Sequence, residues 1–474
     1  MEMSLREEAL TSDVDSDKWR LQRFLILGSE SGAYKSEKKE FVKKDVKCLQ
    51  RLISLGHGPE VVATIRKTNS AGRCCHRLPV MYALAMCARS ADPDTKKAAY
   101  AALQEVCPEP TDLLTFVMFS EMVSGGTGWG RAQRRAISDW YNNLEDRPKE
   151  LAKGVTKTPV NNQWTHRDVM RLSHIKTDSS FIMLVIRYVT KGLIAAKNLP
   201  SPVVPTESEL WRDIIMYFEI VEETKQFTGS MDIEGKPEII DKHRLEPCHL
   251  STALLRSTPV WNVLLKHIPL DQVIQNISKI ENVSDKKTVL DRLEDKEELQ
   301  KANVNPFAVV VAMKETEDED VKKTLGRSFD LCVRNLKPTN KKYSVVIWVG
   351  DKIDSDLEGK KSVTARDAIS TLAVSIAKAS HHDSEIVTYL SEEKMKLVIP
   401  DTSTLEYMSK QTRFSDMNTK YTQLVYHVEK SVKSFDAVVI VMYTQDEDFK
   451  RRLSKLYSRH RHSQAGNYCQ HGLQ

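Results

Sequence analysis

Most of this chain is predicted to form a long succession of short amphipathic helices, and this feature restricts its fold more than any other. From residue 17 to residue 336, apolar side chains recur with helical spacing in pieces of roughly ten to sixteen residues, separated by Gly, Pro or Ser/Asp positions. The clearest segments are 44–55, 59–67, 77–89, 94–106, 113–123, 129–142, 181–191, 207–223, 260–267, 270–278 and 305–314. Short helices in such number bury their apolar faces by packing in pairs, so the pattern predicts an α-solenoid.

The character of the sequence changes after a polar linker near residue 338. Residues 343–349 and 435–443 are β-branched apolar runs typical of buried parallel strands, and residues 365–379 and 420–434 between them have helical spacing. Residues 385–390 and 394–399 are predicted to form a strand pair. This alternation indicates a smaller, doubly wound α/β domain. The expected organisation is an acidic N-terminal tail at 1–16, a helical-repeat domain at 17–338, the α/β domain at 342–458 and a C-terminal tail at 459–474.

The positive charge of the chain is concentrated in one segment. The net charge of the 474 residues is +5, but Trp129 to Lys197 alone contain 13 Lys/Arg and 6 Asp/Glu, a net charge of +7. A local patch of this kind can hold nucleic acid without the whole protein being basic. The eight cysteines show neither zinc-ligand spacing nor a C-x-x-C pair, which favours a reducing compartment, and neither a leader nor a membrane span is predicted.

Residues 165–176 (THRDVMRLSHIK) are the part of the charged segment with the clearest pattern. Thr165 is predicted to cap a helix, with Asp168 completing a capping box. The helical period then puts cations on one face and apolar side chains on the other. The cationic face contains Arg167, Arg171 and His174, and the apolar face contains Val169, Leu172 and Ile175. A polyanion is the natural partner of the cationic face.

A second basic stripe occurs in residues 129–141 (WGRAQRRAISDWY). Arg131, Arg134 and Arg135 share one helical face, where guanidinium groups can hold phosphates bidentately. The opposite face is predicted to contain Trp129, Ala132, Ala136 and Trp140. Lys153, Lys157 and Lys176 add charge to the patch, and Trp164 could stack a base. The alternative for the stripes is a solvated helix face, and the alternative for Trp164 is a core anchor.

Candidate sites for chemistry are few. After the first predicted strand, Asp351, Asp354 and Asp356 are weak candidates for a divalent-cation site, because carboxylate oxygens suit hard cations; a merely solvated loop is the alternative. The sequence contains no G-x-S-x-G, P-loop or H-E-x-x-H motif. We therefore expect no catalytic residues, no resident metal and no cofactor, and hence a protein that is not an enzyme.

Several of these segments together resemble the Ro 60 kDa ribonucleoprotein family, whose defining part is the TROVE module. The similar pieces are residues 21–32 (LQRFLILGSESG), 129–141, 155–157, 164–176, 188–192 (YVTKG), 243–245 and 305–307, in that order along the chain. The resemblance implies a ring of HEAT-like helical repeats, followed by an α/β domain similar to von Willebrand factor A. In that domain the family's metal motif D-x-S-x-S is replaced here by Val349-Gly-Asp-Lys-Ile, which implies a degenerate metal site.

The resemblance also implies partners. Relatives bind small structured Y RNAs on the outer surface and single-stranded 3′ ends of misfolded noncoding RNAs in the central hole, in RNA quality control. Lys157 and His174, flanked by Arg167 and Arg171, match the Y RNA surface. We therefore expect an RNA-binding component of a small ribonucleoprotein, a cytoplasmic monomer that also enters the nucleus, with other RNA-binding proteins as further partners and no membrane. The alternative is a helical-repeat scaffold that binds proteins and no specific RNA.

Overall fold

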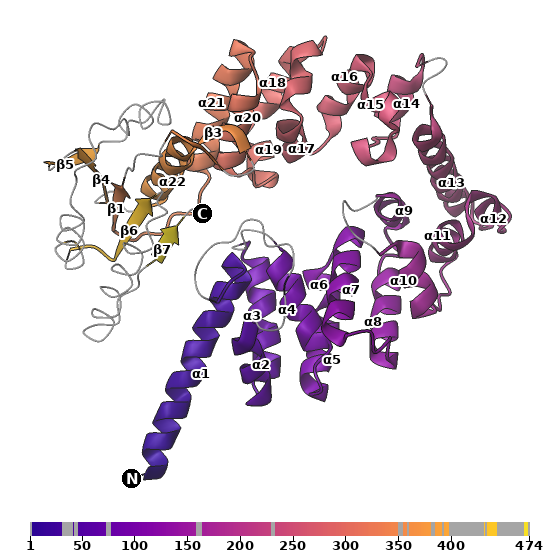
Figure 1. The fold of residues 1–474 in the computed structure, drawn as a ribbon. Helices are drawn as coiled ribbons and strands as arrows, with labels where there is room; N and C mark the ends of the chain where they lie inside the picture. Colours follow the sequence, from indigo (N-terminus) through magenta and orange to yellow (C-terminus); the bar gives the residue numbers. More distant parts are fainter. Residues whose placement is uncertain are drawn as a thin grey trace. The chain divides into compact units, whose positions relative to one another are not determined.

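The chain divides into two compact units, whose helices and strands are labelled in Figure 1. The computed structural model describes residues 2–30, 41, 46–72, 77–157, 164–228, 233–348, 354–357, 360–380, 384–390, 393–397, 431, 434–442 and 469–472. Unit 1 contains Met1–Asp232 and Leu245–Leu254, and unit 2 contains Ile233–Arg244 and Leu255–Gln474. In the described residues, no helix combines the length and the apolar character that a membrane crossing requires.

Unit 1 consists of helices alone within its described residues. They are α1 (Glu2–Leu27), α2 (Lys47–Ser54), α3 (Gly58–Ser70), α4 (Leu78–Ala88), α5 (Pro93–Ala101), α6 (Leu103–Val106), α7 (Pro110–Ser124), α8 (Arg131–Asn142), α9 (Pro148–Thr156), α10 (His166–Ser173), α11 (Ser180–Lys191), α12 (Leu193–Lys197), α13 (Pro205–Gln226), the 3-10 turn η2 (Pro247–His249) and α15 (Thr252–Leu255), which ends at the unit boundary. The predicted succession of short helices is confirmed. The predicted segment 94–106 is divided into α5 and α6 at Ala102.

The N-terminal residues differ from the expectation. Residues 2–16, predicted to form an acidic tail, belong to α1. Residues 2–10 contain three Glu and two Leu together with Met, Arg and Ala, all strong helix formers, so the acidic charge of the stretch does not prevent helix formation. The domain boundaries drawn from the sequence, and closure of the helices into a ring, stay predictions.

An aromatic cluster forms the core at the start of unit 1. Tyr82 of α4 lies with its ring centroid 5.3 Å from those of Phe41 and Phe119, and Phe24 of α1 lies 5.7 Å from Phe41. All four side chains are buried. The Phe24–Phe41 and Tyr82–Phe119 pairs are edge-to-face, an arrangement that adds to the free energy gained from burial alone. The cluster joins α1, α4 and α7 and so fixes the first helices of the array.

Unit 2 contains further short helices followed by a sheet. Its elements are α14 (Lys236–Lys242), α16 (Thr258–His267), α17 (Leu270–Gln275), η3 (Ile277–Asn282), α18 (Lys286–Glu294), α19 (Lys296–Lys301), α20 (Pro306–Glu315), α21 (Glu319–Arg334), β1 (Tyr343–Trp348), β2 (Asp356–Leu357), β3 (Lys360–Thr364), α22 (Ala365–Ala379), β4 (Glu385–Leu390), β5 (Glu393–Leu397), β6 (Ala437–Met442) and β7 (Cys469–Gly472). The chain is therefore mostly helical with a smaller α/β part at its end, as predicted.

The five-stranded sheet has the order β5-β4-β1-β6-β7. β1 pairs in parallel with both β4 and β6, with Tyr343 opposite Ala437, while β4 and β5 are antiparallel. The two apolar runs predicted as buried parallel strands are thus neighbours at the centre of the sheet. The hairpin of β2 and β3, and β7 within the predicted C-terminal tail, were not predicted. The helix predicted at 420–434 lies almost entirely outside the described residues.

Helix α22 links the sheet to the helices that precede it. It begins with a capping box formed by Thr364 and Asp367, contacts β1, β4 and β6, and packs against α20 and α21 on another side (Figure 1). Lys314 Nζ of α20 lies 3.2 Å from the nearly buried carboxylate of Asp367. The α/β part is therefore joined to the last helices of unit 2 through packing as well as through the chain.

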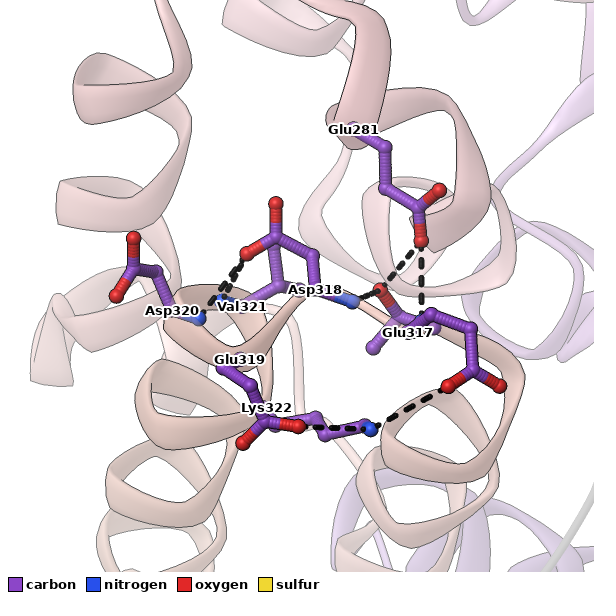
Figure 2. Close-up of polar contacts among 8 residues, drawn as sticks. Glu281, Glu317, Asp318, Glu319, Asp320, Val321 and Lys322 are labelled. Carbon is purple, nitrogen blue, oxygen red and sulfur yellow. Dashed lines mark hydrogen bonds and ion pairs between the residues drawn. The ribbon is translucent and has the colours of Figure 1, made fainter.

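The start of α21 forms an acidic corner (Figure 2). Thr316 Oγ1 and the backbone N–H of Glu317 donate to Glu281 Oε1, at 2.8 and 3.1 Å. Asp318 accepts from the N–H groups of Asp320 and Val321 and so caps the helix. Four acidic residues occupy consecutive positions 317–320, and carboxylates at a helix N-terminus are favoured by its dipole. The negative charge of this corner would repel a polyanion such as RNA.

Candidate nucleic-acid interface

The two basic stripes lie on helices α8 and α10 of unit 1, which pack against each other (Figure 1). All three arginines of α8, Arg131, Arg134 and Arg135, are exposed, as are Arg167 and Arg171 of α10. Only Arg135 among the five pairs with a described carboxylate, at 3.8 Å from Asp139. The other four guanidinium groups make no ion pair with any described residue. Their donors are therefore directed to solvent and are available to an anion.

Helix α10 begins as predicted. The Thr165 side chain accepts from the N–H of Asp168, and the Asp168 carboxylate accepts in return from the backbone N–H of Thr165, which is the capping box. This reciprocal pair satisfies donors that a helix start leaves open. The helix start, and with it the position of Arg167, is thus set by local sequence.

The end of α10 differs from the prediction. The helix stops at Ser173, and His174 is not part of it but occupies the C-cap with φ 50° and ψ 53°. This left-handed conformation ends helices and is costly for residues other than glycine, although Asn, Asp and His adopt it most readily. His174 is exposed, but its direction is set by the backbone turn and not by the helical period.

The buried faces of both helices are rotated from those predicted. In α10 the buried residues are His166, Val169, Met170 and Ser173, whereas Leu172, predicted to be buried, is 40% exposed. In α8 the buried residues are Gln133, Ile137, Trp140 and Tyr141, whereas Ala132 is exposed and Ala136 only half-buried. The rotation leaves every arginine of the two stripes on the solvent side.

Polar and aromatic contacts join α8 to α10. The hydroxyl of Tyr141 lies 2.7 Å from Nδ1 of His166, and both side chains are buried. Burial lowers the pKa of His166 to about 3, so the ring is neutral at pH 7. Asn142 Nδ2 donates to the backbone carbonyl of Lys176 at 2.9 Å. These contacts hold the two exposed basic faces on one continuous surface of neighbouring helices.

Trp164 takes part in a ring contact within unit 1. Its ring lies 6.0 Å from that of Trp129, with an interplanar angle of 32°, and both indoles are half-buried. The pair connects the residues immediately before α8 and α10. Trp164 therefore serves as an anchor between the two helix starts, while both indoles stay partly exposed.

Lys157 belongs to a different contact. It follows α9, is 34% exposed, and its Nζ lies 2.7 Å from Oε1 of Glu246, whose side chain is 20% exposed. Lys153, one turn earlier on α9, is exposed, and so is Lys176 after α10. The candidate cations thus fall into two classes. Lys157 is held by a carboxylate at short distance. The exposed arginines and lysines make no close ion pair with a described carboxylate.

A buried hydrogen-bond network fixes the end of α9 behind Lys157. Thr156 Oγ1 donates to the carbonyl of Lys153 at 2.7 Å and lies 3.2 Å from both His249 Nε2 and the Tyr217 hydroxyl. His249 Nδ1 accepts from the backbone N–H of Glu246 at 3.1 Å, so Nε2 carries the proton of the neutral ring. Burial, and after it the charge of Lys225, lowers the pKa of His249 to about 4.

Lys225 completes this network. Its Nζ donates to the carbonyl of Thr156 at 2.7 Å, and burial lowers its pKa from the ordinary value for lysine. The network therefore joins α9, α13 and the segment around η2, and it positions Lys157 and Glu246 against each other. It was not predictable from the sequence, because Thr156 and His249 are 93 positions apart and no sequence pattern links them.

Among the described residues, the candidate cation ligands of the α/β part do not form a site. Asp351 lies outside the described residues, Asp354 accepts from Nε and Nη2 of Arg366 at 2.7 and 2.8 Å, and Asp356 lies in the short strand β2. A bidentate guanidinium occupies the oxygens that a cation would need. Within the described part of the chain, no three His, Cys, Asp or Glu side chains are placed to hold a metal ion.

Comparison with known proteins agrees with this architecture. A TROVE domain matches residues 6–202, which include α8, α10 and Lys157. RNA-binding protein RO60 of Caenorhabditis elegans is 27% identical over 72% of this chain, and the match spans 64% of that relative. RNA-binding protein RO60 of Deinococcus radiodurans is 22% identical, over 91% of this chain and 81% of the relative. The TROVE match and these two relatives together support the Ro 60 kDa family for this chain.

The fold agrees with that of a solved member of this family. The crystal structure of the Deinococcus radiodurans RO (RSR) protein superimposes with a TM-score of 0.75, covers 95% of this chain and 91% of that one, and is 19% identical. At this identity the likeness shows the fold alone. The succession of helices followed by a small parallel sheet is therefore a fold that this chain shares with the solved structure.

Proposed function

We propose that this chain is an RNA-binding, non-enzymatic component of a small ribonucleoprotein. Its ligands are small structured noncoding RNAs of the Y type, held on the exposed faces of α8 and α10. The observation that carries the proposal is the arrangement of five exposed arginines on two helices that are packed together, four of them without a carboxylate partner among the described residues. Guanidinium groups hold phosphates bidentately, and phosphate contacts position an RNA without reading its sequence.

The charge distribution supports a restricted binding surface. The segment from Trp129 to Lys197 has a net charge of +7, whereas the corner at the start of α21 contains four consecutive acidic residues. An RNA would be attracted to the first and repelled by the second. The family relatives named as RNA-binding proteins favour the same ligand class.

A second ligand class follows from the family. We propose that single-stranded 3′ ends of misfolded noncoding RNAs are also bound, so that the protein takes part in RNA quality control in the cytoplasm, and also in the nucleus. The chain would act as a monomer, with other RNA-binding proteins associating through the shared RNA. The competing function is that of a protein-binding scaffold in which the basic surface is incidental.

Crosslinking tests the proposal against the scaffold. RNA crosslinked to the full chain in cells is sequenced, and the crosslinked peptides are identified. The proposal predicts a small set of structured noncoding RNAs crosslinked to peptides of α8 and α10. Random RNA fragments, or crosslinks spread evenly over both units, would contradict it and favour the scaffold.

A further inference from the structure

A groove between α5 and α8 of unit 1 has the features of a ligand site. Its volume is about 540 Å³, within the usual range for small-ligand sites of about 300–1,000 Å³. The wall on one side comes from α5 and the start of α6, and the wall on the other side comes from α8. All of these elements belong to the same compact unit.

The groove is lined by more positive than negative charge. Lys96 and Lys97 of α5 and Arg135 of α8 are among its lining residues, and Asp139 is the single carboxylate among its described lining residues. Neither lysine makes an ion pair with a described residue. Arg135 lies 3.8 Å from Asp139, and both side chains are highly exposed, so that pair is weak and an anion can replace it. The groove therefore favours a phosphate group.

The groove also offers groups that suit a nucleobase. Tyr100 is half-buried in one wall, and the other wall is backed by Trp140, which is almost fully buried and fixed by its hydrogen bond to the Cys107 carbonyl. Gln104 Oε1 is buried and accepts no hydrogen bond from any described residue. A buried acceptor without a donor is unfavourable, so a ligand that supplies an N–H or O–H group would be stabilised there.

We propose that this groove binds one nucleotide of a single-stranded RNA segment. Lys96, Lys97 and Arg135 hold the phosphate, the base lies along Tyr100, and Gln104 accepts a hydrogen bond from an amino group of the base. Arg135 belongs both to this groove and to the arginine stripe of α8, so the groove extends the RNA surface toward α5. The inference rests on the proposed RNA-binding function and adds to it a nucleotide site on a different pair of helices.

The test uses the full chain, fluorescence anisotropy and two labelled RNAs, a single-stranded oligoadenylate and a structured hairpin. Lys96→Ala/Lys97→Ala should weaken oligoadenylate binding about tenfold or more and reduce the salt dependence of log K by about 0.7 for each phosphate that the protein no longer holds. The matched control is Lys47→Ala/Lys67→Ala, which removes two exposed lysines elsewhere in unit 1 and should change little. Circular dichroism confirms that the variants fold.

A second variant tests contact with the base. Gln104→Leu should weaken binding of oligoadenylate while leaving binding of the same oligonucleotide built from purine riboside, which lacks the amino group, unchanged. Equal effects on both oligonucleotides, or none, would overturn the assigned role of Gln104. Adenosine monophosphate distinguishes a free nucleotide from a nucleotide within an RNA. If adenosine monophosphate binds, and the Lys96/Lys97 variant loses this binding but still binds RNA, then the groove holds a free nucleotide and the RNA assignment is wrong.

Comparison of the two double variants distinguishes failure of this inference from failure of the proposed function. If Arg167→Ala/Arg171→Ala weakens hairpin binding but the Lys96/Lys97 variant binds oligoadenylate like the unmodified protein, the groove assignment fails and the RNA surface on α8 and α10 stands. If neither variant changes the binding of either RNA, both fail.

Discussion

Lys157 Nζ lies 2.7 Å from Glu246 Oε1, and both side chains are partly buried. The cation that the family resemblance assigns to RNA is therefore neutralised within the protein itself. Since the Thr156, His249 and Lys225 contacts fix both partners, the pair is held in place from behind. An RNA phosphate that reaches Lys157 has to displace the Glu246 carboxylate, so Glu246 should lower RNA affinity.

Glu246→Gln should raise RNA affinity. Removal of the competing charge frees Lys157, and since a partly exposed ion pair contributes about 0.5–1 kcal/mol, the gain should be about two- to fivefold. Anisotropy titration with a structured RNA measures it. Glu150→Gln, which removes an exposed carboxylate of α9, is the matched control for a general change of charge. In a Lys157→Ala background the gain should disappear, and a gain that persists there would show that Glu246 acts by another route.

His174→Gly should affect stability and binding in opposite directions. Glycine relieves the left-handed backbone at φ 50° and should stabilise the chain by about 0.5–1 kcal/mol, while loss of the imidazole weakens RNA binding. His174→Asn, which also tolerates this conformation, should weaken binding with little change in stability. Urea midpoints and RNA titrations measure both effects. Unchanged RNA affinity in both variants would remove His174 from the interface.

His249 should make the fold sensitive to moderate acid. Its pKa is about 4 in the folded chain, below the ordinary 6.5, so between these values the unfolded chain takes up a proton that the folded chain does not. The stability is complete above pH 6.5 and decreases as the pH falls toward 4. In His249→Gln the urea midpoint should fall less over this interval, while the contribution of His166 is retained in both proteins. Identical pH profiles would contradict the burial of a neutral His249.

The parts of the interface that were predictable from sequence are those set by local interactions. The capping box joins Thr165 to Asp168, only three positions away, and the arginines of α8 are separated by one helical turn, so period and propensity suffice. The exposure of Leu172 and the burial of Gln133 depend on which neighbours α10 and α8 meet, and periodicity does not contain that information.

Long-range pairings were not predictable for the same reason. Lys157 meets Glu246 only because α9, α13 and the η2 segment converge in the fold. Strand β7 pairs with β6, although its sequence shows neither alternating nor continuous apolar residues. In the α/β part, by contrast, two long apolar runs at 343–349 and 435–443 made the central parallel strands visible, because a buried strand needs apolar side chains on both faces. The order of the two parts, helices first and the α/β part second, was predictable from the same change in pattern.

Arg167→Ala/Arg171→Ala tests the central claim most directly. These exposed side chains make no ion pair with a described residue, so their removal should leave the fold intact while the protein no longer holds two of the RNA phosphates. RNA gel-shift affinity at near-physiological salt should fall about tenfold or more, and the salt dependence of log K should decrease by about 0.7 to 0.9 per phosphate. Lys47→Ala/Lys67→Ala should bind like the unmodified protein. Unchanged affinity and salt dependence in the arginine variant would contradict RNA binding on α8 and α10.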